Sequence, residues 1–250
     1  MRQIVDKIGT ILSLYSFERS ELGVSELSAE LSWPKSTVSE ILASLVRQGF
    51  VERTPRGRFR LGWRFFELNQ VLLESTPLVR ESRRAMQELV ERHGESSHLM
   101  VLERHQAVIV EKMQASLATQ ILMSRVGLRL PAHCSACGKL LLALLPWDEV
   151  RHVFDNVELK PFTPATITDL GVLERELDDI RERGVAYDRE EIVPGLTCVA
   201  AAIRNEEGKP IAAMSVSIPS YRFADSEPGY VEMIRSAALR VSRKLGHVPS

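Results

Sequence analysis

Apolar residues recur every three or four positions in three short segments at the start of the chain, which is the spacing of one helix face. The segments span residues 4–17, 25–32 and 34–48. Ser25 is a residue type suited to an N-cap, and Pro34 suits the first position of a new helix. The pattern therefore predicts three helices, with a tight break between the second and the third.

A short basic hairpin is predicted directly after the third helix. Residues 51–53 and 58–61 have the composition of strands, and residues 54–57 contain the Pro and Gly of a tight turn. Two short helices joined by a tight break and followed by a hairpin are typical of a winged helix-turn-helix. We therefore assign residues 1–62 to a winged helix-turn-helix DNA-binding domain.

The pattern changes after residue 62. A helical stretch over residues 63–75 ends at Ser75-Thr76-Pro77 and predicts a helical linker, and residues 76–250 mix helices and strands in a second domain. The expected helices lie at about 78–93, 135–145, 147–154, 169–183 and 227–245, and the expected strands at about 97–103, 107–111, 119–123, 185–188, 197–204 and 211–218. The predicted fold class is α+β.

Composition limits the class of protein further. The chain is 44% hydrophobic and 26% charged, and its longest apolar run, residues 140–146, is far shorter than the roughly 20 residues of a membrane span. No signal peptide is recognisable, and three cysteines are too few for a disulfide framework, so we expect a cytoplasmic protein. No nucleophile elbow, Walker A loop or GxGxxG motif occurs, and we expect no enzyme activity and no cofactor.

The third predicted helix and the hairpin carry the candidate DNA-binding residues. Short polar side chains at the start of that helix allow close approach to phosphates and base edges, and arginines spaced by two on the hairpin suit phosphate or minor-groove contact. The alternative is a protein-interaction module whose hairpin arginines only keep an edge soluble. The candidates are Lys35, Ser36, Thr37, Ser39, Glu40, Arg47, Arg56, Arg58 and Arg60.

Three blocks of the sequence resemble the IclR family of bacterial transcriptional regulators. The stretch GVSELSAELSWPKSTVSEILASLVRQGFVERTPRGRFRLGWRFFEL is similar to that family's winged helix-turn-helix. The block GLRLPAHCSACGKLLLALL, and residues 184–205 followed by GKPIAAMSVSIPSYRF, resemble its effector-binding domain. Ser32 and Arg204 depart from the family pattern, which has Gly at the first position and an aromatic residue or His at the second. The resemblance implies a GAF-like fold for the second domain.

The second domain holds short polar side chains among apolar strands, as a small-ligand site requires. Ser215 and Ser217 alternate with apolar residues, so both hydroxyls face one side of a strand. Taken alone, these serines also fit a solvated sheet surface, and Cys198 and Asp188 also fit a packed core and a charged loop.

The resemblance implies a ligand site at Ala136, Cys137, Asp188, Cys198, Ser215 and Ser217. Since Ala136 and Cys137 would start a helix, and helix N-termini attract anions, the implied ligand is a small organic acid. Asp188 would oppose a carboxylate unless it is protonated or contacts a ligand hydroxyl. Met123 and Leu130 are the expected apolar neighbours that limit the size of the ligand.

Cys134 and Cys137 form a C-x-x-C at the same predicted helix start. A thiolate there would be stabilised and suited to redox chemistry or metal binding. The second ligand pair of a structural zinc site is missing from the sequence, and cysteines that only fill space are the other interpretation. We expect no metal.

Taken together, these features predict a transcriptional regulator with three kinds of partner. They are a double-stranded DNA operator, a small-molecule effector and further copies of the chain, as a homodimer or a dimer of dimers. Exposed apolar residues of the linker, including Leu68, Val71 and Leu72, favour dimerisation there. Repression of a catabolic operon is the commoner mode in the family that the chain resembles, and activation is the alternative.

Overall fold

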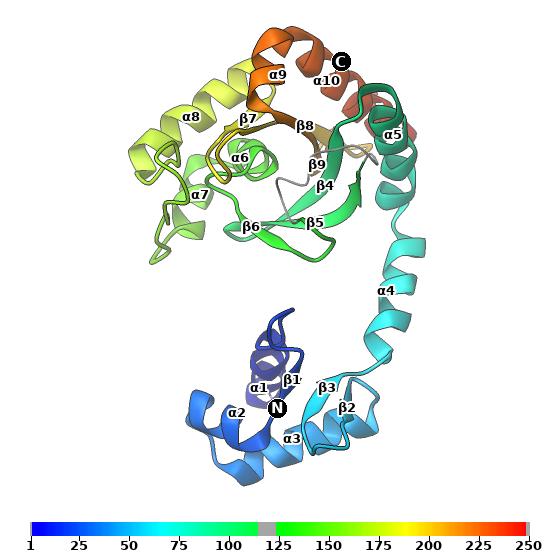
Figure 1. Ribbon diagram of the computed structural model, residues 1–250, viewed down its shortest axis with the longest axis vertical. Helices are drawn as coiled ribbons and strands as arrows, with labels where there is room; N and C mark the ends of the chain where they lie inside the picture. The colour runs from blue at the N-terminus through cyan, green and yellow to red at the C-terminus, as the bar shows by residue number, and fades with distance from the viewer. Residues whose placement is uncertain (1, 115–123, 249–250) are drawn as a thin grey trace. The chain divides into compact units, whose positions relative to one another are not determined.

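The computed structural model describes residues 2–114 and 124–248 (Figure 1). Contacts between residues divide the chain into two compact units, Met1–Ser75 and Thr76–Ser250. The strand expected at 119–123 and its Met123 lie outside the described residues.

The first unit packs three of its four helices with a small antiparallel sheet of order β1-β3-β2. Its core is formed by buried apolar residues from every element up to β3, among them Ile11, Leu22, Leu27, Leu42 and Phe59. The elements are α1 (Arg2–Ser13), β1 (Glu21–Leu22), α2 (Val24–Leu31), α3 (Lys35–Arg47), β2 (Val51–Arg53), β3 (Phe59–Leu61) and α4 (Arg64–Ser75).

Several predicted boundaries in this unit were wrong by one to four residues. The helix α1 ends at Ser13, and Gly23 rather than Ser25 is the N-cap of α2. Pro34 precedes α3 instead of starting it. The strand β1 was not predicted, because two residues are too few to show an alternating pattern.

Ser32 lies in the turn between α2 and α3 with a φ of 55°, in the left-handed region. Glycine, which the family resemblance implies at this position, adopts that region without steric cost. Ser32 adopts the same left-handed conformation although it has a side chain.

The second unit is built on one six-stranded antiparallel sheet of order β6-β5-β4-β9-β8-β7. Its strands are β4 (Ser96–Glu103), β5 (Gln106–Met113), β6 (Arg129–Pro131), β7 (Ala186–Arg189), β8 (Leu196–Arg204) and β9 (Pro210–Pro219). Its helices are α5 (Pro77–His93), α6 (Ala136–Ala143), α7 (Trp147–Val153), α8 (Leu170–Arg183), α9 (Ser220–Asp225) and α10 (Glu227–Lys244). The α+β fold class is confirmed.

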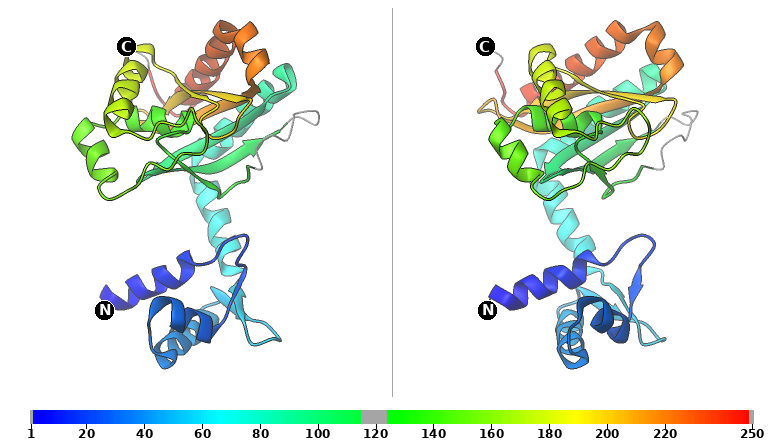
Figure 2. Two further views of the ribbon diagram at one scale, coloured as in Figure 1. Left: turned by 60° about the vertical axis from the view of Figure 1, so that its left-hand side comes forward. Right: turned by 90° about the vertical axis from the view of Figure 1, so that its left-hand side faces the viewer.

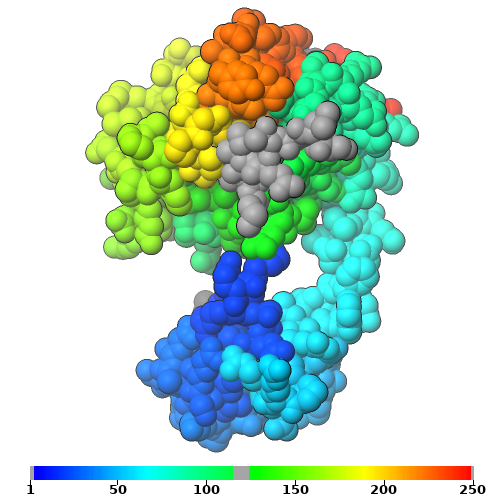
Figure 3. Space-filling view, in the orientation of Figure 1, coloured from blue at the N-terminus to red at the C-terminus, as the bar shows by residue number. Residues whose placement is uncertain are grey.

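Helices cover both faces of this sheet, which curls around α6 (Figures 1 and 2). The helices α5 and α10 pack against each other and on the sheet, and α6 packs on the opposite face with α8 beside it. Outside the grey residues, the face of this unit drawn in Figure 3 is a continuous surface of side chains. The elements β6 and α9 were not predicted, since both are short.

All eight residues of α6 are buried, so this helix forms the centre of the unit. Gly138 explains how α6 lies so close to the preceding chain: a Cβ there would be 2.4 Å from the Cα of Ala132. A side chain at this position is excluded unless the backbone moves.

Within residues 2–114 and 124–248, none of the helices combines the length and the apolar character needed to cross a membrane.

Candidate ligand pocket and DNA-binding face

Strand register brings together three of the residues that the sequence predicted for a ligand site. Asp188 on β7 pairs with Cys198 on β8, and Cys198 pairs with Ser217 on β9. The Cys198 Sγ lies 3.2 Å from the Ser217 Oγ. Because directly opposed residues of adjacent strands point to the same face, the three side chains form one polar row on the curled sheet.

The N-terminus of α6 faces the same pocket. The Ser135 hydroxyl caps the helix by accepting a hydrogen bond from the Gly138 amide at 3.2 Å. The first amides of a helix have no acceptor within the helix, so those of Ala136 and Cys137 are available to a ligand. Ala136, Cys137, Asp188, Cys198, Ser215 and Ser217 all line this one pocket.

Sequence reasoning missed other residues of the pocket. His98 on β4 pairs with Ser215, and its Nε2 lies 2.8 Å from the Ser124 hydroxyl. A histidine within the apolar run of that strand was the available signal. The apolar walls come from Leu130, which the sequence predicted, and from residues that it did not, Met100, Ile109, Ile192, Val193 and Leu196.

The pocket has a volume of only about 20 Å³ in this structure. That space holds about one water molecule, far less than the several hundred Å³ of a typical ligand site. The structure therefore shows the pocket in a closed form, and a ligand the size of an organic acid needs its walls to move apart.

Burial sets the charge of the pocket. Burial raises the pKa of Asp188 to about 7, so this carboxyl is protonated in most molecules just below neutral pH. Burial, together with the Lys112 ammonium, lowers the pKa of His98 to about 4, which leaves this imidazole neutral. At pH 6 neither side chain carries a full charge, so the repulsion between Asp188 and a carboxylate is weakened below its pKa and returns above it.

A buried ion-pair network lies directly behind Asp188. The Lys139 side chain is 2% exposed, and its Nζ binds a carboxylate oxygen of Glu191 and lies 3.3 Å from Glu176. The Glu191 amide donates to the Asp188 Oδ1 at 2.7 Å, and Arg183 pairs with Glu176 at 2.7 Å. The two cations Lys139 and Arg183 balance the two carboxylates Glu176 and Glu191, so this network has no net charge of its own.

The cysteines lie in surroundings that keep their thiols protonated. Cys134 and Cys137 are buried, and burial raises the pKa of Cys134 and raises that of Cys137 to about 12. Burial also raises the pKa of Cys198 well above its usual value. These directions argue against a reactive thiolate at the α6 N-terminus. Among the described residues, no group of three His, Cys, Asp or Glu side chains is placed to hold a metal ion.

The polar face of α3 has the exposure that the sequence predicted. Its buried stripe consists of Val38, Ile41, Leu42 and Leu45. Thr37 is half-buried, and the remaining candidates on this helix are exposed, namely Lys35, Ser36, Ser39, Glu40 and Arg47. A helix with one buried stripe and short polar residues at its start is suited to lie in a major groove.

The hairpin of β2 and β3, residues 51–61, is the wing of this domain. Its three candidate arginines differ in their partners, contrary to the expectation that all three contact DNA. The Arg58 Nη2 donates to the Glu21 carbonyl at 2.7 Å and to the Glu26 Oε2 at 2.8 Å. Arg60 pairs with Glu52 across the hairpin at 2.9 Å. Arg56 lies in the turn, exposed, and forms no ion pair within the described part of the chain. Arg58 therefore ties the wing to α2.

Arg53, exposed at the end of β2, is a basic wing residue that the sequence reasoning did not select.

Comparisons with known proteins agree for both units. Residues 5–55 match the family described as the IclR helix-turn-helix domain, and residues 70–243 match the one described as bacterial transcriptional regulator IclR C-terminal. The chain is 34% identical over 247 residues to the HTH-type transcriptional regulator XynR of Escherichia coli, covering 98% of both chains. It is 32% identical over 228 residues to the HTH-type transcriptional repressor AllR of Klebsiella pneumoniae, covering 90% of this chain and 84% of that protein.

Solved structures show the same architecture over nearly the whole chain. A crystal structure of an IclR homologue from Microbacterium hydrocarbonoxydans, complexed with 4-hydroxybenzoate, superimposes with a TM-score of 0.83 at 28% identity. The match covers 97% of this chain and 98% of that one. These relatives are regulators of transcription, in agreement with the prediction that the chain is not an enzyme.

Proposed function

The chain belongs to the IclR family of bacterial transcriptional regulators, and from this premise we propose that it represses a catabolic operon under the control of a small organic acid. The DNA-binding first unit and the effector-binding second unit are those of the family. The repression, the chemical class of the effector and a cytoplasmic place of action are the proposal.

The single observation that carries the ligand class is the polar row beside the α6 N-terminus. Asp188, Cys198 and Ser217 lie on three paired strands. Ala136 and Cys137, the first two residues of α6, line the same pocket. A ligand carboxylate would accept hydrogen bonds from those amides and from the Ser215 and Ser217 hydroxyls. The protonated Asp188 adds a donor, and the apolar walls accept a short hydrocarbon or aromatic body.

One solved homologue supports the same ligand class. The Microbacterium homologue was crystallised with 4-hydroxybenzoate, which is a carboxylate with an apolar ring and a hydroxyl group. That compound is therefore the first probe for this chain. Because the closed pocket has a volume of only about 20 Å³, binding must stabilise an opened form, which is a shift of population between two states.

For DNA recognition, we assign base contact to the start of α3 and backbone contact to its flanks and the wing. Ser36, Thr37, Ser39 and Glu40 reach base edges, and Lys35, Arg47, Arg56 and Arg60 contact phosphates. Arg58 belongs with the residues that hold the wing in position, because Glu21 and Glu26 already bind it.

Dimerisation is proposed through the first unit and α4. The helix α4 has no buried residue, and it exposes Phe66 and Val71 by 58% and 64%. Such an apolar surface is covered in most proteins by a partner. A second copy would present two recognition helices, one or more helical turns apart, to a pseudo-palindromic operator. A monomer bound to operator, seen by light scattering, would contradict this assembly.

The experiment that tests the ligand site is a thermal-shift and calorimetric screen of small carboxylic, aromatic and hydroxy acids, beginning with 4-hydroxybenzoate. Selective binding to the folded chain raises the unfolding temperature by mass action. We expect the shift to vanish in Ser215→Ala and Cys198→Ala and to persist in Ser75→Ala, an exposed serine in the linker. A shift of equal size in all four proteins would place binding outside this pocket.

A further inference from the structure

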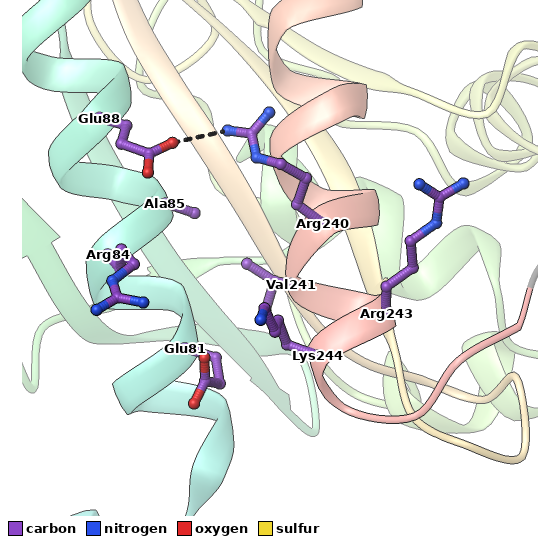
Figure 4. Close-up of a pocket in the computed structure, with 8 residues that line it drawn as sticks. All are labelled: Glu81, Arg84, Ala85, Glu88, Arg240, Val241, Arg243 and Lys244. Carbon is purple, nitrogen blue, oxygen red and sulfur yellow. Dashed lines mark hydrogen bonds and ion pairs between the residues drawn. The ribbon is translucent and has the colours of Figure 1, made fainter.

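Two hollows lie along the line where α5 and α10 pack against each other. The first has a volume of about 430 Å³ (Figure 4) and the second of about 360 Å³. Glu88 and Arg240 line both hollows, and their ion pair of 3.4 Å separates one from the other. Both lie in the second unit, on the opposite side of the sheet from the effector pocket.

The two hollows differ in charge. Four cations, Arg84, Arg240, Arg243 and Lys244, and two carboxylates, Glu81 and Glu88, line the first one. The second has Arg92 and Arg240 against Glu88 and Glu232, which balance while His93 is neutral. Figure 4 shows the Arg243 side chain directed away from α5, so the charges that face the first hollow are Arg84, Arg240 and Lys244 against Glu81 and Glu88. The first hollow therefore has an excess of one positive charge, and a hollow lined mainly by one sign of charge concentrates ions of the opposite sign.

Both carboxylates of the first hollow already have partners. Glu88 pairs with Arg240, and Glu81 pairs with Arg80 on the same helix at 3.1 Å. Within residues 2–114 and 124–248, no ion pair involves Arg84, Arg243 or Lys244. Basic residues in the last turn of α10 are favoured by the helix dipole, which accounts for Arg243 and Lys244. That account does not extend to Arg84 in the middle of α5.

The floor of the hollow is apolar. Ala85 and Val241 are buried, and Figure 4 shows both directed into the space between the two helices. Lys244 extends from α10 toward α5 in the same view. A volume of about 430 Å³ lies within the range of small-molecule sites, which combine an apolar surface with a few charged groups.

We propose that the hollow between α5 and α10 is a second ligand site, which binds a small phosphate monoester. A phosphate monoester carries two negative charges above its second pKa of about 6, and Arg84 and Lys244 are two cations of the hollow that form no ion pair within the described residues. Arg84 offers a guanidinium fork to two phosphate oxygens and Lys244 a point charge. The organic part of the ligand covers Ala85 and Val241. The inference goes beyond the organic-acid pocket and uses none of its residues.

The test is isothermal titration calorimetry of the full chain with phenyl phosphate at pH 8 and low salt. Phenyl phosphate combines a dianion with an apolar ring, and phenyl sulfate is the matched monoanion. The test variant is Arg84→Gln/Lys244→Gln, in which two exposed side chains lose their charge and stay polar. Arg151→Gln, exposed on α7, is the control for loss of a positive charge elsewhere.

We expect phenyl phosphate to bind at least tenfold more tightly than phenyl sulfate, and the double variant to weaken phenyl phosphate binding at least tenfold. Arg151→Gln and Ser215→Ala should each leave the dissociation constant within twofold. Equal binding of the two probes, or unchanged binding by the double variant, overturns the proposal. Loss of binding in Ser215→Ala also overturns it, because the probe would then occupy the effector pocket.

Discussion

The helices α3 and α6 have similar residue types in their first turns and opposite surroundings in the folded chain. Both have short side chains in their first turn, Ser36 and Thr37 in α3 and Ala136 and Cys137 in α6, so both allow an anion to approach the helix amides. In α3 only one stripe is buried, and the rest faces solvent. In α6 all eight residues are buried beneath a curled sheet. An exposed N-terminus suits the extended surface of DNA, and a buried one suits a small ligand that is enclosed.

The contrast is sharpest between Lys35 and Lys139, which occupy the first turns of the two helices. Lys139→Met leaves the Glu191 carboxylate buried without its cation, and removing one partner of a buried pair costs about 3–5 kcal/mol. Lys35→Met changes an exposed residue, and we expect a change within about 0.5 kcal/mol. Urea unfolding followed by circular dichroism measures both.

A second variant separates charge from packing at this position. Lys139→Met/Glu191→Gln removes both charges, and we expect it to recover part of the stability lost in Lys139→Met. If the single variant unfolds at the same urea concentration as the wild type, the ion pair does not stabilise the second unit.

The pH dependence of ligand binding tests the buried helix end. The pKa of Asp188 is raised to about 7, so the side chain is protonated below pH 7 and ionises as the pH rises through this value. Its negative charge then opposes a carboxylate ligand, and the affinity for 4-hydroxybenzoate should fall by up to about tenfold per pH unit above 7. In Asp188→Asn the affinity should be constant between pH 6 and 8.5. Calorimetry at several pH values decides between the two, and an unchanged slope in the variant would assign the pH effect to another group.

Asp188 also makes stability depend on pH in a defined direction. Its pKa is higher in the folded chain than in the unfolded chain, so folding favours the protonated form. The contribution is present in full at low pH and is lost as the pH rises from about 4 to about 7. Asp188→Asn should flatten that part of the pH–stability curve.

Two arginines of the wing differ in the same way: Arg58 is bound by Glu21 and Glu26, and Arg56 is exposed to solvent. Arg58→Ala removes the bonds to Glu21 and Glu26 and should lower the stability of the first unit by about 1 kcal/mol, since the group is partly exposed. Unfolding is followed by the fluorescence of Trp33 and Trp63, which both lie in this unit.

Arg56→Ala should leave that stability unchanged. It should instead reduce the slope of log affinity for DNA against log salt by about one, the signature of a lost phosphate contact. If the affinity of Arg56→Ala for DNA depends on salt as that of the wild type does, the turn of the wing does not contact DNA.

The smallest expected effect concerns base recognition by α3. Ser36→Ala and Thr37→Ala each remove one hydroxyl, and a lost hydrogen bond of this kind is worth about 1 kcal/mol. Affinity for operator DNA should fall severalfold while affinity for random DNA stays constant, as measured by fluorescence anisotropy. Equal losses on both DNAs would contradict the assignment of α3 as the recognition helix.

The DNA-binding unit was largely predictable because its signals are local. The three helices, the Pro34 break and the hairpin each depend on residues a few positions apart, and the structure changed only their ends. What the sequence did not show was that Arg58 is held by Glu21 and Glu26, which lie 37 and 32 positions away. Spacing along a strand shows which side chains point to the same side of the strand. It does not show which residues of other segments form hydrogen bonds or ion pairs with them.

The residues of the ligand pocket were predicted only in part. Resemblance to a family selected six residues, and the structure placed all six on one pocket. His98 and Ile192 were missed, since neither belongs to a motif. Only the sheet register brings β4 beside β9 and β7 beside β8.

The sequence by itself determined the order and type of most elements, because helix and strand periodicities, caps and breaks are encoded over short stretches. Tertiary structure decided the charge and the openness of the sites. Burial raises the pKa of Asp188 to about 7, encloses Lys139 between carboxylates and closes the pocket to about 20 Å³. The physical reason is that desolvation depends on everything packed around a group, and those neighbours come from segments far apart in the chain.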